Sequence, residues 1–250
     1  MGGMALAAGV AYLLACLGLF MAQRSLIFYP QPRRSGTAAS VIKMQVEGAE
    51  LRVSVRPLAG ADAVLYFGGN AEDVSGSLPT MEAAFPQQSL YLVHYRGYGG
   101  SSGKPSEAAL FADALAVFDQ LQRQHPNITV VGRSLGSGVA VHLASVRPVK
   151  RLVLVTPYDS IAGIAAQQFP MFPIRYLLTD KFESWRDAPR VTAPTTIVAA
   201  ANDVVIPGAS TRELLARFKA GVAHYVLIPD AGHNTISEHA AYIGALQPGA

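Results

Sequence analysis

The sequence is poor in cysteine and in charge. Cys16 is its only cysteine, so no disulfide can form within the chain, and cysteine usage does not indicate a redox compartment. Charged residues make up 15% of the chain, the formal net charge is only +3, and Lys and Arg are scattered rather than gathered in runs. Nucleic acid is therefore not expected as a partner.

Low-complexity segments are absent as well. Half of the residues are hydrophobic, and glycine and proline are spread along the whole chain. This composition excludes an extended disordered protein. A chain of 250 residues is long enough to bury one large hydrophobic core, so we expect one compact domain.

One long hydrophobic run is present, at residues 4–22 (MALAAGVAYLLACLGLFMA). It carries no charge, and as a helix it would rise about 28 Å, close to the thickness of the hydrocarbon core of a bilayer. A helix that is apolar on all sides has no polar face for water, which disfavours a buried helix of the domain. We expect residues 1–23 to form a single transmembrane anchor and residues 24–40 to form a connector at the membrane interface.

Other fates of this hydrophobic run stay open. No Lys or Arg precedes it, which disfavours a cleaved signal peptide. The letters LLAC at residues 13–16 resemble a lipoprotein processing box in which Cys16 is acylated, but the residues that follow remain apolar. Arg24, Arg33 and Arg34 follow the run and favour a cytoplasmic body by the positive-inside rule. Three scattered arginines leave the side of the membrane undecided.

The rest of the chain alternates between short apolar runs and helical patterns. Residues 41–58 alternate in polarity around Gly48, which predicts a β-hairpin. Strands that are covered on both faces are expected at residues 63–67, 89–95, 128–132, 151–156, 195–201 and 224–229. Helices are expected at residues 105–124, directly after Ser134, and at residues 210–220, where Ser210 is the expected cap and Glu213 its partner. This alternation predicts an α/β domain over residues 41–250, with a mostly parallel sheet and helices on both faces.

Residues 160–191 interrupt that alternation. They lie between two expected strands but are too long and too rich in aromatic residues and proline for an ordinary crossover. We expect this segment to be a short lid over the carboxyl edge of the sheet. A single plain helix with an irregular exit is the alternative.

The stretch ITVVGRSLGSGVAVHLA, residues 128–144, places a serine between two glycines where an expected strand meets an expected helix. A serine hydroxyl is a weak nucleophile, and it needs a neighbouring base together with donors for the oxyanion that it creates. A sharp turn exposes Ser134, and it brings the chain so close that positions 132 and 136 admit little beyond Gly132 and Gly136. The helix that follows directs its first N–H groups at the site, which makes the N–H of Leu135 one expected oxyanion donor.

A base and an orienting acid are expected on loops after later strands, in the order acid and then histidine. Asp203 follows one strand and His233 follows the next, so we expect them to complete a Ser-His-Asp triad. Asp159, which follows an earlier strand, is the alternative acid, whereas Asp230 is too close to His233 along the chain. Asp159 otherwise caps the lid helix. The remaining histidines have no such convergence and are expected to be packing or surface residues.

The second oxyanion donor is expected from the loop YFGGNAEDV after the first inner strand. Gly68 and Gly69 let the backbone approach the acyl group, and the N–H of Asn70 is the expected donor. The side chain of Asn70 could instead brace the loop. The Gly- and Ser-rich loop at residues 94–106 lacks a P-loop lysine, because Lys104 precedes a proline, and it is expected to shape the pocket with Tyr98 as a wall.

These pieces together resemble the α/β-hydrolase fold over residues 41–246, and in particular the membrane-anchored α/β-hydrolase-domain serine hydrolases related to the serine-aminopeptidase-like and depalmitoylase groups. The matching segments are RSLIFYP, FGGNAED, YRGYGGSSGKPS, GRSLGSG, TPYDSI, ANDVVIP and AGHN. The resemblance implies the same triad of Ser134, Asp203 and His233 and the same oxyanion pair of Asn70 and Leu135. One departure is Gly68, where related hydrolases commonly carry histidine, but the backbone donor survives this change.

The sequence thus predicts a serine hydrolase that needs no metal and no cofactor and that cleaves an ester or thioester through an acyl-enzyme. A small-molecule, acyl or lipid-like substrate and a membrane are the expected partners. A peptidase or amidase on the same triad is the alternative, and it would need an acidic residue such as Glu72 or Asp73 to hold a free amine. A membrane-tethered binding protein without catalysis is a further alternative, which the intact triad disfavours. Substrate identity does not follow from the fold.

Overall fold

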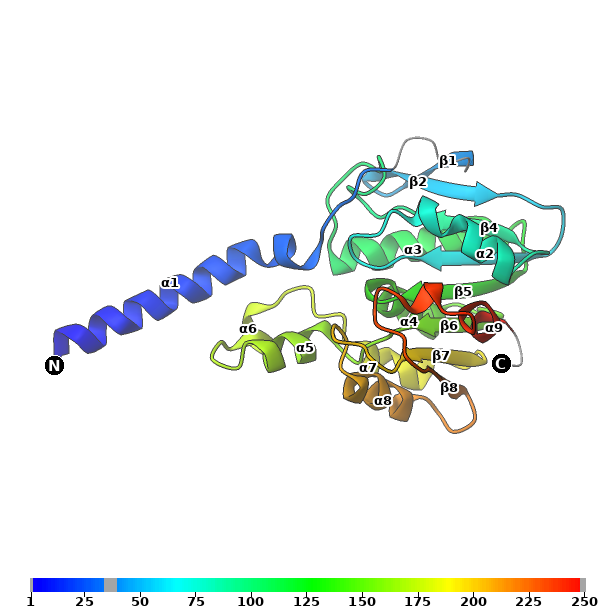
Figure 1. The fold of residues 1–250 in the computed structure, drawn as a ribbon. Helices are drawn as coiled ribbons and strands as arrows, with labels where there is room; N and C mark the ends of the chain where they lie inside the picture. The colour runs from blue at the N-terminus through cyan, green and yellow to red at the C-terminus, as the bar shows by residue number, and fades with distance from the viewer. Residues whose placement is uncertain (1, 34–39, 248–250) are drawn as a thin grey trace.

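The computed structural model describes residues 2–33 and 40–247 and contains one eight-stranded sheet (Figure 1). The strands alternate with helices along the chain, as expected for crossover units. The strands are β1 (Ser40–Val46), β2 (Ala49–Arg56), β3 (Asp62–Phe67), β4 (Ser89–Val93), β5 (Asn127–Arg133), β6 (Arg151–Val155), β7 (Thr195–Ala200) and β8 (Ala223–Ile228). All six predicted inner strands and the predicted hairpin are present.

The strand order in the sheet is β1-β2-β4-β3-β5-β6-β7-β8. Strands β3 to β8 run parallel to one another, while β2 is antiparallel to both β1 and β4. Phe67 at the end of β3 pairs with Gly132 near the end of β5, so the loops that leave these strands begin side by side. The register therefore brings the segment after Phe67 next to Ser134.

Helices cover both faces of the sheet and bury an apolar core on each. The helices are α1 (Gly2–Ile27), α2 (Leu78–Ala84), α3 (Glu107–Gln122), α4 (Leu135–Val146), α5 (Ile161–Gln168), α6 (Ile174–Leu177), α7 (Ser184–Asp187), α8 (Gly208–Arg217) and α9 (Tyr242–Leu246). Short 3-10 turns are η1 (Val74–Ser77), η2 (Ala188–Arg190) and η3 (Ile236–Glu238). Buried residues of α3, α4 and α8 share one core cluster, and those of α2 and α9 share the other. The predicted α/β class, a mostly parallel sheet with helices on both faces, is confirmed.

Three local details differ from the sequence expectation. Helices α2 and α9 are present although each has too few turns to give a clear hydrophobic period. The helix expected at residue 210 begins at Gly208, directly after Pro207, and Ser210 is buried instead of capping it. The hydroxyl of Ser210 donates to the carboxylate of Asp159, so this serine joins α8 to the loop after β6.

The segment at residues 160–191, called the lid below, folds as three short helices and a 3-10 turn rather than as one helix. Ser160 caps α5 by accepting a hydrogen bond from the N–H of Gly163 at 2.9 Å, so the cap expected of Asp159 is supplied by its neighbour. The base of the lid is fixed to α3, because the carboxylate of Glu107 accepts the N–H groups of Lys181 and Phe182 at 2.7 and 3.0 Å.

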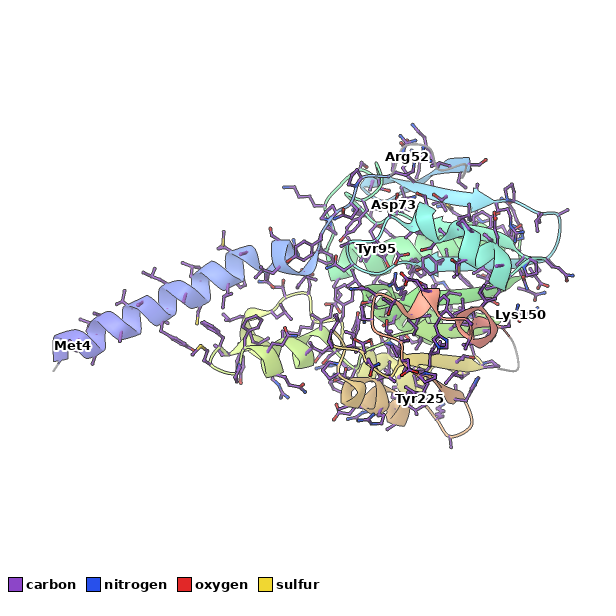
Figure 2. The ribbon with its side chains drawn as sticks, in the orientation of Figure 1. Met4, Arg52, Asp73, Tyr95, Lys150 and Tyr225 are labelled. Atoms are coloured by element: carbon purple, nitrogen blue, oxygen red, sulfur yellow. The ribbon has the colours of Figure 1, made fainter. Side chains whose placement is uncertain are left out.

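Helix α1 extends away from the body, with α5 and α6 beside its C-terminal half (Figure 1). Within the described residues it is the one helix long and apolar enough to cross a membrane, a property that a signal sequence shares. Met4 at its far end touches none of the body and is 83% exposed (Figure 2). The helix continues to Ile27, beyond the predicted boundary at residue 23. Residues 34–39 of the predicted connector, including Arg34, and the last residues of the domain from 248 lie outside the described residues.

Candidate active site

Ser134 occupies a strained turn between β5 and α4. Its backbone has φ of 49° and ψ of −116°, a conformation that is costly for a residue with a side chain. A Cβ atom at Gly136 would lie 2.1 Å from the carbonyl oxygen of Phe67, and one at Gly132 would lie 2.4 Å from the carbonyl oxygen of Gly136. Both positions therefore require glycine, because the chain segments on either side of the turn are in contact.

His233 lies between Ser134 and Asp203. Its Nε2 atom is 2.9 Å from Oγ of Ser134, and its Nδ1 atom is 2.8 Å from Oδ2 of Asp203. The imidazole and the carboxylate are both buried. With the proton on Nδ1, the ring donates to the carboxylate and its Nε2 accepts the hydrogen bond of the serine hydroxyl. The structure thus brings together the three residues that the sequence analysis selected.

The carboxylate of Asp203 is oriented by its own loop. Its Oδ1 atom accepts the N–H groups of Val205 and Ile206 at 2.9 and 2.7 Å, which leaves Oδ2 for the imidazole. The alternative acid, Asp159, is engaged elsewhere, since it accepts the hydroxyls of Ser160 and Ser210. Geometry therefore favours Asp203 as the partner of the imidazole.

The residues of the two expected oxyanion donors, Asn70 and Leu135, line the same cavity as Ser134. Leu135 is the first residue of α4, so its N–H has no partner within the helix. The side-chain oxygen of Asn70 accepts hydrogen bonds from the N–H of Tyr29 and the hydroxyl of Tyr98, each at 2.9 Å. This amide braces the loop, as the sequence allowed, and it fixes the residue whose backbone N–H is the expected donor.

Glu72 stabilises the loop that carries Asn70, and the sequence analysis did not identify this role. Its Oε2 atom accepts the N–H of Gly69 at 2.6 Å, while its Oε1 atom accepts the hydroxyls of Tyr66 and Ser77 at 2.7 and 2.6 Å. Gly69 in turn lies against Ser134, and its neighbour Gly68 packs against Val74. The carboxylate is not a solvated loop acid, and it is not free to hold a substrate amine.

Arg133, the residue before the serine, links this loop to the histidine. Its guanidinium lies 3.3 Å from the carboxylate of Glu72 and donates to the carbonyl oxygen of His233 at 3.4 Å. Burial lowers the pKa of Arg133, but the charge and hydrogen bond of Glu72 together with Tyr66 and Tyr242 outweigh this effect, so the pKa is raised. Arg133 therefore ties the loop that carries Asn70 to the loop that carries His233.

We expect Glu72→Gln to lower kcat for the ester hydrolysis predicted from the sequence about tenfold and to leave KM nearly unchanged, because the amide cannot accept from all of these donors and the loop that carries Asn70 loosens. Steady-state kinetics with a soluble ester measures the split, and Glu82→Gln, a partly exposed residue of α2, is the matched control. An unchanged kcat in Glu72→Gln would remove the positioning role.

Two cavities of different character meet at Ser134. A mainly apolar cavity of about 320 Å³ is lined by Leu135, Tyr158 and lid residues, and it also reaches Asn70. A polar cavity of about 570 Å³ on the other side is lined by Glu72, Arg133, His233 and residues near η3. Tyr158 forms the aromatic wall, whereas Tyr98 is buried behind Asn70, where burial raises its pKa to about 12.

Two histidines outside the triad, His94 and His125, are buried packing residues, one of the two roles expected from the sequence. His94 is buried with its Nε2 atom 2.9 Å from Oγ of Ser54, and burial lowers its pKa to about 4, so it is neutral at physiological pH. His125 is buried against Tyr91. Neither lies on the walls of the two cavities at Ser134.

An eight-stranded, mostly parallel sheet with a serine on a strand-to-helix turn, and with Asp and His on loops after later strands, defines an α/β hydrolase. The profile of the alpha/beta hydrolase fold family matches residues 62–182. The chain is 35% identical over 230 residues to an uncharacterised protein of Mycobacterium tuberculosis, with 85% of this chain and 80% of that protein covered. The chain belongs to the α/β-hydrolase family.

A further relative is the alpha/beta hydrolase domain-containing protein aho-3 of Caenorhabditis elegans, which is 30% identical over 229 residues and covers 86% of this chain and 67% of its own length. Among solved structures, alpha/beta hydrolase domain-containing protein 10 from mouse superposes with a TM-score of 0.64 at 15% identity, covering 83% of this chain and 95% of its own. This last similarity supports the fold alone.

Proposed function

We propose that the protein is a membrane-anchored serine hydrolase that cleaves a carboxylic ester or thioester through an acyl-enzyme intermediate. One observation carries the proposal: the unbroken hydrogen-bond chain from Asp203 through His233 to Ser134. A base on one side of a serine hydroxyl and an orienting acid on the other side of that base form the arrangement that activates a serine nucleophile.

In the first half of the reaction, Oγ of Ser134 attacks the carbonyl carbon while Nε2 of His233 takes the hydroxyl proton. The negative charge moves to the carbonyl oxygen, where the N–H groups of Asn70 and Leu135 receive it. The bond from carbon to the leaving oxygen or sulfur then breaks, and the imidazolium gives its proton to that atom. Asp203 stabilises the imidazolium and stays ionised throughout.

In the second half, water replaces the leaving group. His233 takes a proton from the water as the hydroxide attacks the acyl carbon, and the same two N–H groups stabilise the second oxyanion. Collapse of this intermediate breaks the bond to Oγ of Ser134, which recovers its proton from the imidazolium. The acid is released, and the enzyme returns to its initial state with no group consumed.

The cavities favour an ester or thioester over a peptide. An apolar cavity suits an acyl chain, while a peptidase that reads a free amine would need an unengaged acid near the serine. Glu72 is saturated by hydrogen bonds and Asp73 caps η1 by accepting from the N–H of Ser75, so both acids considered for that role are engaged. The peptidase therefore ranks second.

A covalent probe tests the nucleophile. A fluorophosphonate is expected to label the full-length protein in detergent micelles and to fail with Ser134→Ala, since phosphonylation needs the activated hydroxyl. Ser145→Ala, near the far end of α4, is the control and should label like wild type. Equal labelling of Ser134→Ala and wild type would refute the proposal, and faster cleavage of peptide anilides than of matched esters would favour the peptidase.

A further inference from the structure

Helix α1 lines part of the apolar cavity at Ser134, although its length and composition suggest only a membrane anchor. Four of its residues, Leu19, Gln23, Leu26 and Ile27, line the cavity together with the nucleophile. The facing wall comes from the lid, where Ile161 and Ile164 of α5, Phe169, and Ile174 and Leu177 of α6 are among the lining residues. The cavity is therefore bounded on one side by the very helix that has the length and composition of a membrane span.

The contact between α1 and the lid is specific. Gln23 is buried, and its amide donates to the carbonyl oxygen of Leu177 at 3.2 Å and accepts the N–H and hydroxyl of Thr179 at 2.7 and 2.8 Å. The next residue of the helix, Arg24, pairs with Asp180 at 3.0 Å. A polar side chain that satisfies three groups of one lid segment fixes the rotation of the helix, so the same face of α1 always meets the cavity.

The lid also accompanies α1 along its apolar stretch. The hydroxyl of Tyr12 donates to the carbonyl oxygen of Met171 at 2.8 Å, and its ring stacks on Phe172. Tyr12 lies about 17 Å along the helix from Gln23, given the rise per residue of an α-helix. If α1 spans a bilayer, the tip of the lid reaches the hydrocarbon layer beside Tyr12.

The side chains at this tip match such a location. Three large apolar or aromatic residues within residues 169–176 of the lid are exposed: Met171 is 73% exposed, Tyr176 is 90% exposed, and Phe169 is half-exposed and also lines the cavity. Clustered large apolar side chains at a surface mark a contact with a membrane or another apolar body. The exposed lid residues adjoin α1, because Met171 accepts the hydrogen bond of Tyr12. The apolar surroundings that fit them are therefore the bilayer that α1 itself would occupy.

We propose that α1 is a wall of the substrate site, and that the cavity between α1 and the lid takes the acyl chain of a membrane amphiphile directly from the bilayer. This inference rests on the proposed function. The acyl chain lies along Leu19 and Leu26 with its carbonyl at Ser134, and the polar leaving group extends into the polar cavity beside Arg133 and Asn234. Substrate reaches the serine without crossing water.

A pair of tryptophan substitutions on α1 separates this role from simple tethering. Leu19 lines the cavity, whereas Leu17 is exposed on the other side of the same helix. Full-length wild type, Leu19→Trp and Leu17→Trp are incorporated into phosphatidylcholine nanodiscs, and hydrolysis of a palmitoyl ester and a butyryl ester with one common chromogenic leaving group is measured in each.

Leu19→Trp is expected to lower kcat/KM for the palmitoyl ester by about tenfold or more while changing that for the butyryl ester less than about twofold, because the indole fills space that only a long chain needs. Leu17→Trp is expected to leave both values near those of wild type. The same loss on both esters, no loss on either, or an equal loss in Leu17→Trp would each overturn the inference.

Failure of the underlying chemistry gives a different result. If wild type hydrolyses neither ester and Ser134 takes no fluorophosphonate label, the proposed function is wrong. The acyl-chain site at α1, which rests on that function, is then refuted as well. If wild type labels and hydrolyses the butyryl ester but prefers it over the palmitoyl ester in the nanodisc, the hydrolase stands and the acyl site on α1 is refuted.

Discussion

Asp203→Asn is expected to lower kcat/KM for ester hydrolysis by about ten-thousandfold while the protein stays folded. An amide at this position can present its NH₂ group to the imidazole, which selects the tautomer with the proton on Nε2. That nitrogen then cannot accept the proton of Ser134, from which it lies 2.9 Å away. Steady-state hydrolysis of a soluble ester, together with the thermal unfolding midpoint, measures both parts of this prediction.

Asp159→Asn is the matched control, because Asp159 is the other acid that follows an inner strand. Its carboxylate accepts the hydroxyls of Ser160 and Ser210 and thereby joins the lid to α8, so its loss should reduce stability more than it reduces kcat. Full activity in Asp203→Asn, or an equally large loss of kcat/KM in Asp159→Asn, would contradict Asp203 as the acid that orients His233 and would favour Asp159.

The groups that share a short local pattern were predictable from the sequence. Ser134 stands between Gly132 and Gly136 directly after an apolar strand, and both the turn and its crowding are properties of neighbouring residues. Asp203 and His233 follow consecutive strands of a parallel sheet, and such strands end at one edge. Chain order alone was therefore enough to place these groups together.

Glu72 and Arg133 were missed as positioning residues for a physical reason. A charged residue in a loop is normally solvated, and only tertiary packing tells a buried carboxylate with four donors from an exposed one. The spacing did contain a signal, since Glu72 follows Gly69 by three residues and its side chain returns to that N–H. Arg133 was a second signal, because it places a charged side chain directly before Ser134 at the end of an otherwise mainly apolar strand.

The part played by α1 was not predictable, because it depends on contacts between residues more than 150 positions apart. Composition treats residues 4–22 as uniform, and nothing in it distinguishes Leu19 from Leu17. The same holds for the bond from the N–H of Tyr29 to the side chain of Asn70. Tyr29, in the segment predicted to be an interfacial connector, is thus attached to the loop that carries Asn70, so α1 and the proposed active site are mechanically linked.

Gly136→Ala is expected to reduce the free energy of unfolding by about 3 kcal/mol or more and to abolish most activity. The new Cβ would lie 2.1 Å from the carbonyl oxygen of Phe67 and 2.6 Å from that of Gly68. Both are backbone atoms at the end of β3, so relief of the clash must move the strand end from which the oxyanion loop departs.

Gly244→Ala provides the contrast, since a Cβ there meets nothing within 4 Å and the residue lies in helix α9. Removing the flexibility of a helical glycine should raise stability by about 0.5–1 kcal/mol. Thermal unfolding in detergent micelles and ester hydrolysis are measured for both variants. A Gly136→Ala protein as stable and active as wild type would mean that the backbone at Ser134 is not held in its strained turn by β3, and the geometry on which the nucleophile depends would then need another cause.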